Sequence, residues 1–160
     1  MPLNIVIGSD HHGILVRIKI AENLRQQGHW VVEFGPPMDS TQAVDYPDIA
    51  AEIAGRVSRH ESDRGILICG TGLGMSIAAN KFDGVRAAPV IDEISAELSR
   101  RHNDLNVLCL SGELLGEEIA DRIVNLWINT PFDGGRHAKR IKKIADIEKE
   151  LQIQKSESQS

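Results

Sequence analysis

The sequence predicts an α/β protein built on one parallel sheet, and two observations carry this prediction. Short apolar runs alternate with amphipathic stretches along nearly the whole chain, which is the pattern of strand–helix–strand units. The apolar runs are also nearly continuous, as expected for strands that helices cover on both faces. We therefore expect a three-layer α/β/α sandwich with a five-stranded parallel sheet, Rossmann-like, in the common strand order 2-1-3-4-5.

The sequence marks these elements in order along the chain. Gly28 is expected to end the first helix, because glycine commonly follows a helix C-terminus. The second helix is expected to begin after Asp45, with Pro47 in its first turn, where proline needs no backbone N–H. The expected strands cover residues 3–8, 29–34, 65–69, 85–91 and 106–110, and the expected helices cover residues 14–27, 47–59, 75–81, 94–101, 117–129 and 136–151. Together they predict a single domain over residues 1–151, followed by a polar, disordered tail over residues 152–160.

Composition narrows the class of protein. A chain of 160 residues, 41% of them hydrophobic, buries enough surface to fold without disulfides or metals. The two cysteines lack the CxxC spacing of a zinc site and fit a reducing compartment. A net charge of −5 argues against nucleic-acid binding. The N-terminus does not resemble a signal peptide, and no apolar run is long enough to span a membrane, so we expect a cytoplasmic protein without membrane contact.

Two polar loops follow the first and third expected strands. In a sheet of this kind, ligands bind outside the carboxyl ends of the strands that flank the reversal in strand order. For the order 2-1-3-4-5 these are the first and third strands, whose carboxyl ends continue into Gly8-Ser-Asp-His-His-Gly13 and Cys69-Gly-Thr-Gly-Leu-Gly74. The fold alone therefore points to these two loops as the candidate site.

The loop that begins at Cys69 joins a strand to a helix and has glycine at alternate positions. Glycines let the backbone approach a ligand, and the N–H groups of such a turn suit an anion or a developing oxyanion. The GxGxG spacing is neither a dinucleotide-binding fingerprint nor a P-loop. A tight connection with a buried cysteine is one interpretation. The other is a thiol that acts as base or nucleophile at the edge of the crevice.

Three further groups of residues are candidates, each with a simpler structural interpretation beside it. Asp10 and His11 form either a helix cap with an exposed histidine or a pair that orients ligand hydroxyls. His102 and Asn103 lie in an expected loop, where a histidine is usually structural unless it approaches Cys69. Arg136 and Arg140 are four residues apart on the last helix, where they either form a solvated basic face or bind one phosphate.

Several long segments, taken together, resemble the type B ribose-5-phosphate isomerase family, which also contains galactose-6-phosphate and allose-6-phosphate isomerases. The segments are GSDHHG, DYPDIA, GILICGTGLGMSIAANK, VRAA, SAELSRRHNDLNVL and GGRHAKR, which between them span nearly all of the chain except the C-terminal tail. The resemblance implies a five-stranded parallel sandwich, no cofactor and no metal. It also implies a homodimer with active sites shared between the subunits, or a tetramer, that interconverts ribose 5-phosphate and ribulose 5-phosphate through an enediolate.

The resemblance also implies a role for each candidate residue. Cys69 is expected to be the base, and His102 is expected to help open the furanose ring. The enediolate oxygens are expected to be held by Thr71 and by the loop backbone of Gly70, Gly72, Leu73 and Gly74. The remaining sugar and phosphate oxygens are expected to be held by Asp10, His11, Asn103, Arg136 and Arg140.

Two positions depart from the family pattern. Glu113 stands where relatives commonly carry an arginine, and Ile94 replaces a common aromatic residue. These departures leave the preferred sugar open between ribose 5-phosphate and a substrate of the allose 6-phosphate or galactose 6-phosphate type. A non-catalytic sugar-phosphate-binding module is the alternative from another class, although such a module needs no base and acid together.

Overall fold

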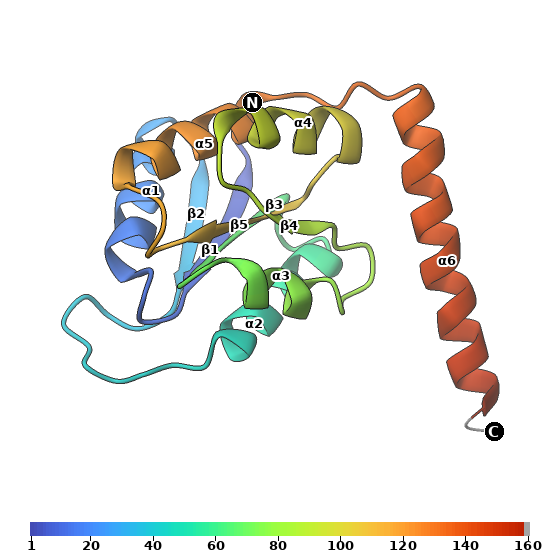
Figure 1. The fold of residues 1–160 in the computed structure, drawn as a ribbon, viewed down its shortest axis with the longest axis horizontal. Helices are drawn as coiled ribbons and strands as arrows, with labels where there is room; N and C mark the ends of the chain where they lie inside the picture. The colour runs from blue at the N-terminus through green and yellow to red at the C-terminus, as the bar shows by residue number, and fades with distance from the viewer. Residues whose placement is uncertain (159–160) are drawn as a thin grey trace.

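Residues 1–158, which the computed structural model describes, form a five-stranded parallel sheet covered by helices, and the predicted fold class is confirmed (Figure 1). The strands are β1 (Asn4–Ser9), β2 (Trp30–Phe34), β3 (Arg64–Cys69), β4 (Ala87–Pro89) and β5 (Val107–Ser111). The register pairs Ser9 of β1 with Ile68 of β3, and Cys69 of β3 with Ser111 of β5. The carboxyl ends of these three strands therefore meet at one edge of the sheet.

The strand order is β2-β1-β3-β5-β4, so the last two strands exchange the places that the order 2-1-3-4-5 gives them. β5 lies between β3 and β4, and each of its residues is buried, as a continuous apolar run favours. β4 is shorter than the predicted strand 85–91 and ends at Pro89. Proline has no N–H to donate to a neighbouring strand on its other side. These properties place β4 at the edge. The reversal beside β1 and β3, on which the site prediction depends, is unaffected.

Helices cover both faces of the sheet, and Figure 1 shows α2 and α3 below it and α4 and α5 above it. The helices are α1 (Ile14–Gln26), α2 (Tyr46–Ser58), α3 (Leu73–Ala79), α4 (Glu93–Asn103), α5 (Glu117–Asn129) and α6 (Arg136–Ser158). Pro47 lies in the first turn of α2, as predicted. Gly28 follows the C-terminus of α1 with φ of 90°, a left-handed conformation that favours glycine.

Strand residues alternate between two apolar clusters, one on each face of the sheet. The cluster beneath α1, α4 and α5 takes Ile5, Ile7, Ile66, Ile68, Leu108 and Leu110 from the strands. The cluster beneath α2 and α3 takes Val6, Leu67, Cys69, Val107 and Cys109. Cys69 thus belongs to the α2 and α3 face, and burial raises the pKa of the neighbouring Cys109 thiol.

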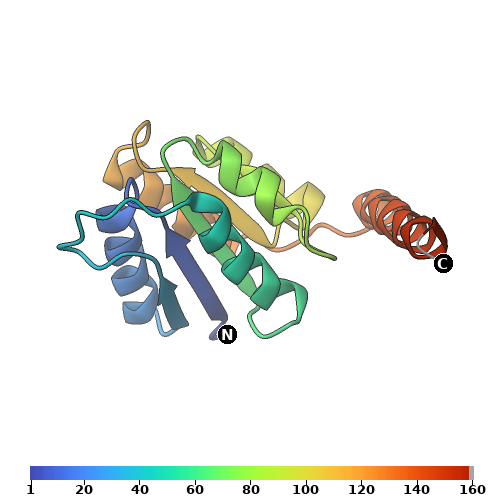
Figure 2. The same ribbon diagram turned by 90° about the horizontal axis from the view of Figure 1, so that it is seen from below.

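α6 is set off from the sheet in both views (Figures 1 and 2), and it contacts the rest of the chain through the stack of His137 on His102 of α4 and through Glu148, which accepts a hydrogen bond from the Gly84 N–H. Ile144, Ile147 and Leu151 are each about half exposed along this helix. The helix also extends beyond its predicted end at residue 151. Residues 152–158 are helical where a disordered tail was expected, because glutamine, lysine and glutamate favour helix, and residues 159–160 lie outside the described part of the chain. None of the helices in residues 1–158 is both long and apolar enough to cross a membrane.

Candidate active site

The loop after β3 turns tightly back on the Cys69 thiol. The backbone N–H of Gly72 donates a hydrogen bond to Cys69 Sγ at 3.2 Å. Gly72 has φ of 77°, and a Cβ at this position would lie 3.2 Å from the carbonyl carbon and oxygen of Leu110. Glycine is therefore required here both by the backbone conformation and by the close approach to β5. The loop holds the thiol next to a helix N-terminus, as the sequence predicts.

A cavity of about 320 Å³ opens beside Cys69 at the carboxyl edge of the sheet. It is lined by Asp10, His12, Tyr46, Cys69, Gly70, Thr71, Gly74 and Glu113. Five of the predicted site residues thus meet in one place, because the ends of β1 and β3 are adjacent. Of the remaining loop residues, Gly72 contacts the thiol through its N–H, and Leu73 donates its N–H to Thr71 Oγ1 at 3.3 Å.

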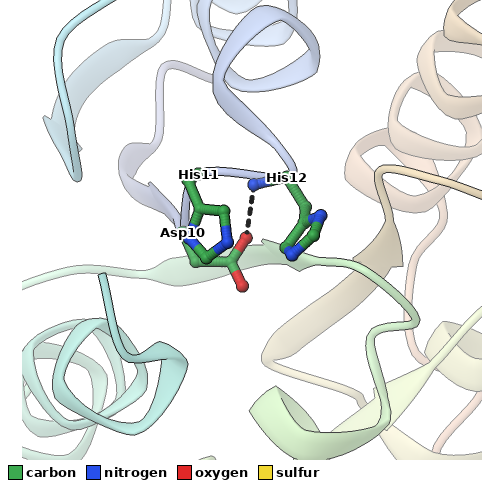
Figure 3. Close-up of side chains that lie close together, drawn as sticks. All are labelled: Asp10, His11 and His12. Carbon is green, nitrogen blue, oxygen red and sulfur yellow. Dashed lines mark hydrogen bonds between the residues drawn. The ribbon is translucent and has the colours of Figure 1, made fainter. Parts of the chain in front are cut away.

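Asp10, His11 and His12 lie close together where β1 ends (Figure 3). The buried Asp10 carboxylate accepts a hydrogen bond from the His12 N–H at 2.9 Å. The His11 ring turns to the loop before α2, where Nδ1 accepts a hydrogen bond from the N–H of Val44. Of the two histidines, the structure therefore places His12 rather than the predicted His11 in the Cys69 cavity.

Two further residues of the cavity, His12 and Tyr46, were not singled out from the sequence. A Cβ on Gly74 would lie 2.6 Å from the Tyr46 ring, so the tyrosine lies directly over the glycine-rich loop. Tyr46 is the first residue of α2 and precedes the helix-starting Pro47. This place at a helix start, next to the predicted crevice, was the sequence signal available for it. For His12, the signal was its position beside Asp10 in the loop already selected.

Glu113 forms part of the cavity wall. Its carboxylate lies 2.6 Å from His12 Nδ1 and 3.3 Å from the position that a Cβ would take on Gly70. Its backbone is bound to the same loop, because the Glu113 N–H donates to the Gly70 carbonyl at 3.3 Å. The N–H of Gly112 likewise donates to the Cys69 carbonyl at 2.8 Å. The β5–α5 connection therefore fixes the Glu113 carboxylate against the loop that carries the thiol.

The remaining predicted residues gather in a second cluster, around the end of α4 and the start of α6. The rings of His102 and His137 stack with centroids 4.2 Å apart and planes 4° apart. Arg136 Nε contacts His137 Nε2 at 3.5 Å, and Asp133 pairs with Arg101 at 3.2 Å. Two predicted residues complete the cluster: Asn103 follows His102, and Arg140 lies one turn along α6.

Positive charge dominates this second cluster. The pKa of His137 is lowered first by burial and then by the neighbouring His102, Arg136 and Arg140. The pKa of Asp133 is lowered, mainly by its hydrogen bond with Arg101. A site with these charges suits an anion such as a phosphate.

Within one chain, the two clusters lie at opposite ends of the strands. Cys69 ends β3 at the carboxyl edge, whereas His102 comes shortly before Val107, which begins β5 at the amino edge. The chain folds in this way because α4 runs antiparallel to the strands that it connects. His102, Asn103, Arg136 and Arg140 are therefore not brought to Cys69 within the single chain.

Two groups in residues 1–158 have ligand atoms close enough to suggest a metal: Asp10, His11 and His12, and His102, Asp133 and His137. In the first group, Asp10 Oδ1 accepts a hydrogen bond from the His12 N–H, and His11 Nδ1 accepts one from the Val44 N–H. In the second group, Arg101 occupies Asp133, and two parallel stacked rings do not direct their nitrogens to one point. Both arrangements favour hydrogen bonding over metal coordination.

A parallel sheet with a thiol, a carboxylate and a glycine-rich loop around a cavity at its switch point defines a small-molecule-binding α/β protein. The comparison with known families makes this class specific. The family model described as Ribose/Galactose Isomerase matches residues 5–144, and the chain belongs to this family.

Individual relatives match over nearly their full lengths. Ribose-5-phosphate isomerase B of Escherichia coli is 44% identical over 144 residues, covering 90% of this chain and 95% of that protein. The structure of ribose-5-phosphate isomerase B from Clostridium thermocellum is 47% identical with a TM-score of 0.87, covering 92% of this chain and 98% of that chain. The Mycoplasma genitalium enzyme with bound ribulose 5-phosphate is 44% identical with a TM-score of 0.88, covering 92% and 97%.

Proposed function

We propose that this protein is an aldose–ketose isomerase that interconverts ribose 5-phosphate and ribulose 5-phosphate. The observation that carries the proposal is the cavity in which Cys69, Asp10 and Thr71 meet the glycine-rich loop. Family membership and the names of the similar enzymes support it. The proposed catalytic domain covers residues 1–151.

The proposed reaction moves one proton between neighbouring carbons. Cys69 takes the proton from C2 of the open-chain aldose, the C2–H electrons form the C1=C2 bond, and the carbonyl electrons pass to O1, which gives the enediolate. The proton then returns to C1 while the hydroxyl proton of O2 passes to O1, so that C2 becomes the carbonyl of the ketose. Negative charge develops on oxygen in this step, so fixed donors are needed nearby. We assign this role to the Thr71 hydroxyl and the backbone N–H groups of the loop; those of Gly72 and Leu73, which donate to Cys69 Sγ and Thr71 Oγ1 within the loop, would exchange these partners for the substrate oxygens. Asp10, placed beside them, accepts hydrogen bonds from sugar hydroxyls.

A second set of groups is needed to open the furanose ring and to hold the phosphate. We assign ring opening to His102 and phosphate binding to Arg136 and Arg140. Asn103, which is exposed beside His102, is assigned to sugar oxygens. These assignments suit the positive charge of the cluster in which the residues lie.

The Cys69 set and the His102 set lie at opposite ends of the strands in one chain. One subunit therefore cannot bring both sets of groups to a single sugar. We therefore propose a homodimer in which the carboxyl edge of one subunit faces the α4 and α6 cluster of the other. Two complete sites then form, each with Cys69 from one chain and His102 from its partner. The position of α6 away from the sheet and its half-exposed apolar residues are consistent with a helix that packs on a partner.

A substrate panel tests the proposed function. The purified protein is assayed on ribose 5-phosphate, allose 6-phosphate and galactose 6-phosphate, with and without a chelator. We expect the highest kcat/KM with ribose 5-phosphate and no effect of the chelator. Higher kcat/KM with a six-carbon sugar phosphate would assign the protein to that alternative, and sugar-phosphate binding without turnover of any substrate would leave a non-catalytic binding module.

A further inference from the structure

The walls of the Cys69 cavity carry an unusual balance of charge for a site that receives a phosphorylated sugar. Its lining includes two carboxylates, those of Asp10 and Glu113, and contains neither lysine nor arginine. A phosphate carries up to two negative charges, so each carboxylate within reach opposes its binding. The two carboxylates of this half of the site therefore oppose a phosphate.

Of the two carboxylates, that of Glu113 is held at a defined place beside the Cys69 loop. The carboxylate lies over Gly70, the residue after Cys69, and the contacts with His12 and with the Gly70 carbonyl hold it there. The phosphate of a five-carbon sugar is only a few bonds from the carbons on which Cys69 acts. Charges within about 8 Å of one another are only partly screened at physiological ionic strength, so a carboxylate in the wall of the cavity that receives the reacting carbons is expected to act on the phosphate.

The same carboxylate can bind an uncharged sugar through a hydrogen bond. A carboxylate oxygen accepts a hydrogen bond from a hydroxyl group, and about half of the Glu113 side chain is exposed. An unphosphorylated aldose presents a hydroxyl where a sugar phosphate presents its charge. Glu113 therefore penalises one substrate and not the other.

We propose that Glu113 is a specificity-determining residue that lowers the preference of this site for phosphorylated over unphosphorylated aldoses. The inference rests on the proposed isomerase function. It assigns free aldopentoses as a second substrate class and leaves the binding of the phosphate to the cluster of Arg136 and Arg140.

The test compares Glu113→Gln and Glu113→Arg with the unaltered protein on ribose 5-phosphate and D-ribose, with slow turnover of D-ribose followed by NMR. Glu118→Gln is the matched control, because Glu118 is also exposed and acidic but does not line the cavity. The quantity of interest is the ratio of kcat/KM for ribose 5-phosphate to that for D-ribose. We expect this ratio to rise about 3- to 10-fold in Glu113→Gln and further in Glu113→Arg, mainly through KM for the phosphate, and to stay unchanged in the control.

A ratio that is unchanged or lower in both Glu113 variants would refute the proposal. Equal changes on both sugars would mean that Glu113 shapes the cavity without sensing charge, which also contradicts it. If the unaltered protein turns over no sugar, the proposed function fails, and calorimetric binding of inorganic phosphate then decides the inference separately. Tighter phosphate binding in the two Glu113 variants than in the unaltered protein and in Glu118→Gln would support it, and equal binding would refute it.

Discussion

The imidazole rings of His102 and His137 stack almost in parallel, 4.2 Å apart, and join the end of α4 to the start of α6. This contact connects residues that lie 35 positions apart and fixes the proposed ring-opening histidine beside Arg136. It also places the His102 ring where its charge contributes to lowering the pKa of His137. The stacked pair therefore joins the two helices that carry the second cluster.

The first prediction concerns the pKa of His137. Burial and the charges around it lower this pKa below 6.5, so the folded protein binds this proton less readily than the unfolded chain does. The contribution of neutral His137 to stability is therefore present above about pH 6.5 and is lost as the pH falls below that value. We expect NMR titration to give a pKa below 6.5 that rises in His102→Ala. The pKa is expected to remain below 6.5 in that variant, because burial is the larger cause. An unchanged value in His102→Ala would show that the stacked ring has no influence.

The second prediction concerns the thiol. Cys69→Ala removes the proposed base but no group that binds the phosphate, so we expect kcat to fall about 100-fold or more with little change in substrate affinity. Exchange of the C2 proton with deuterated solvent is expected to stop, as measured by NMR. Cys109→Ala is the matched control, because its thiol is buried in the same cluster away from the cavity, and it is expected to keep the exchange. Continued exchange in Cys69→Ala would assign the base to another residue.

The third prediction separates ring opening from proton transfer. If His102 acts only on the cyclic form, His102→Ala loses kcat/KM on ribose 5-phosphate and keeps it on erythrose 4-phosphate, whose phosphorylated terminal oxygen cannot close a furanose. We expect a difference of at least about 10-fold between the two losses, within the usual range for one acid–base group. Steady-state assays on both substrates measure it. Equal losses would indicate a role common to both reactions.

The sheet and the Cys69 half of the site could be predicted because both follow from local pattern. Apolar runs, glycine at a helix end and the rule for strand carboxyl ends select Asp10 and Cys69 together. The places of β4 and β5 could not be predicted in the same way, because strand neighbours are decided by burial between elements. The same limit applies to His102, since only the tertiary structure shows that it lies at the opposite edge from Cys69.

The fourth prediction concerns stability. Arg17 is buried beneath the loop after β2, where its guanidinium donates to the carbonyls of Phe34 and Pro36 and pairs with Glu33. Arg17→Met removes the guanidinium donor from both carbonyls and leaves Glu33 with Arg25 alone, so we expect a loss of about 3–5 kcal/mol in the free energy of unfolding, measured with urea. Arg25→Met is the matched control. It removes an exposed partner of the same Glu33 and is expected to cost at most about 1 kcal/mol. Similar losses in both variants would show that burial of Arg17 adds nothing.

The last prediction tests whether the two clusters meet across a subunit boundary. Cys69→Ala damages the carboxyl edge of a chain, and the double variant Arg136→Ala/Arg140→Ala damages its α6 cluster. After subunit exchange, about half of the dimers are hybrids, and each hybrid contains one site with both halves intact. Activity is therefore expected to recover to about a quarter of the unaltered value, since half of the sites in half of the dimers are complete. His102→Ala in place of the double arginine variant is expected to give the same recovery.

Cys69→Ala mixed with Thr71→Ala is the control, because both changes lie in the same half of the site and every site of a hybrid dimer keeps one of them. Recovery in that control, or none in the first mixture after mass spectrometry has verified exchange, would mean that the site is not divided between the chains as proposed.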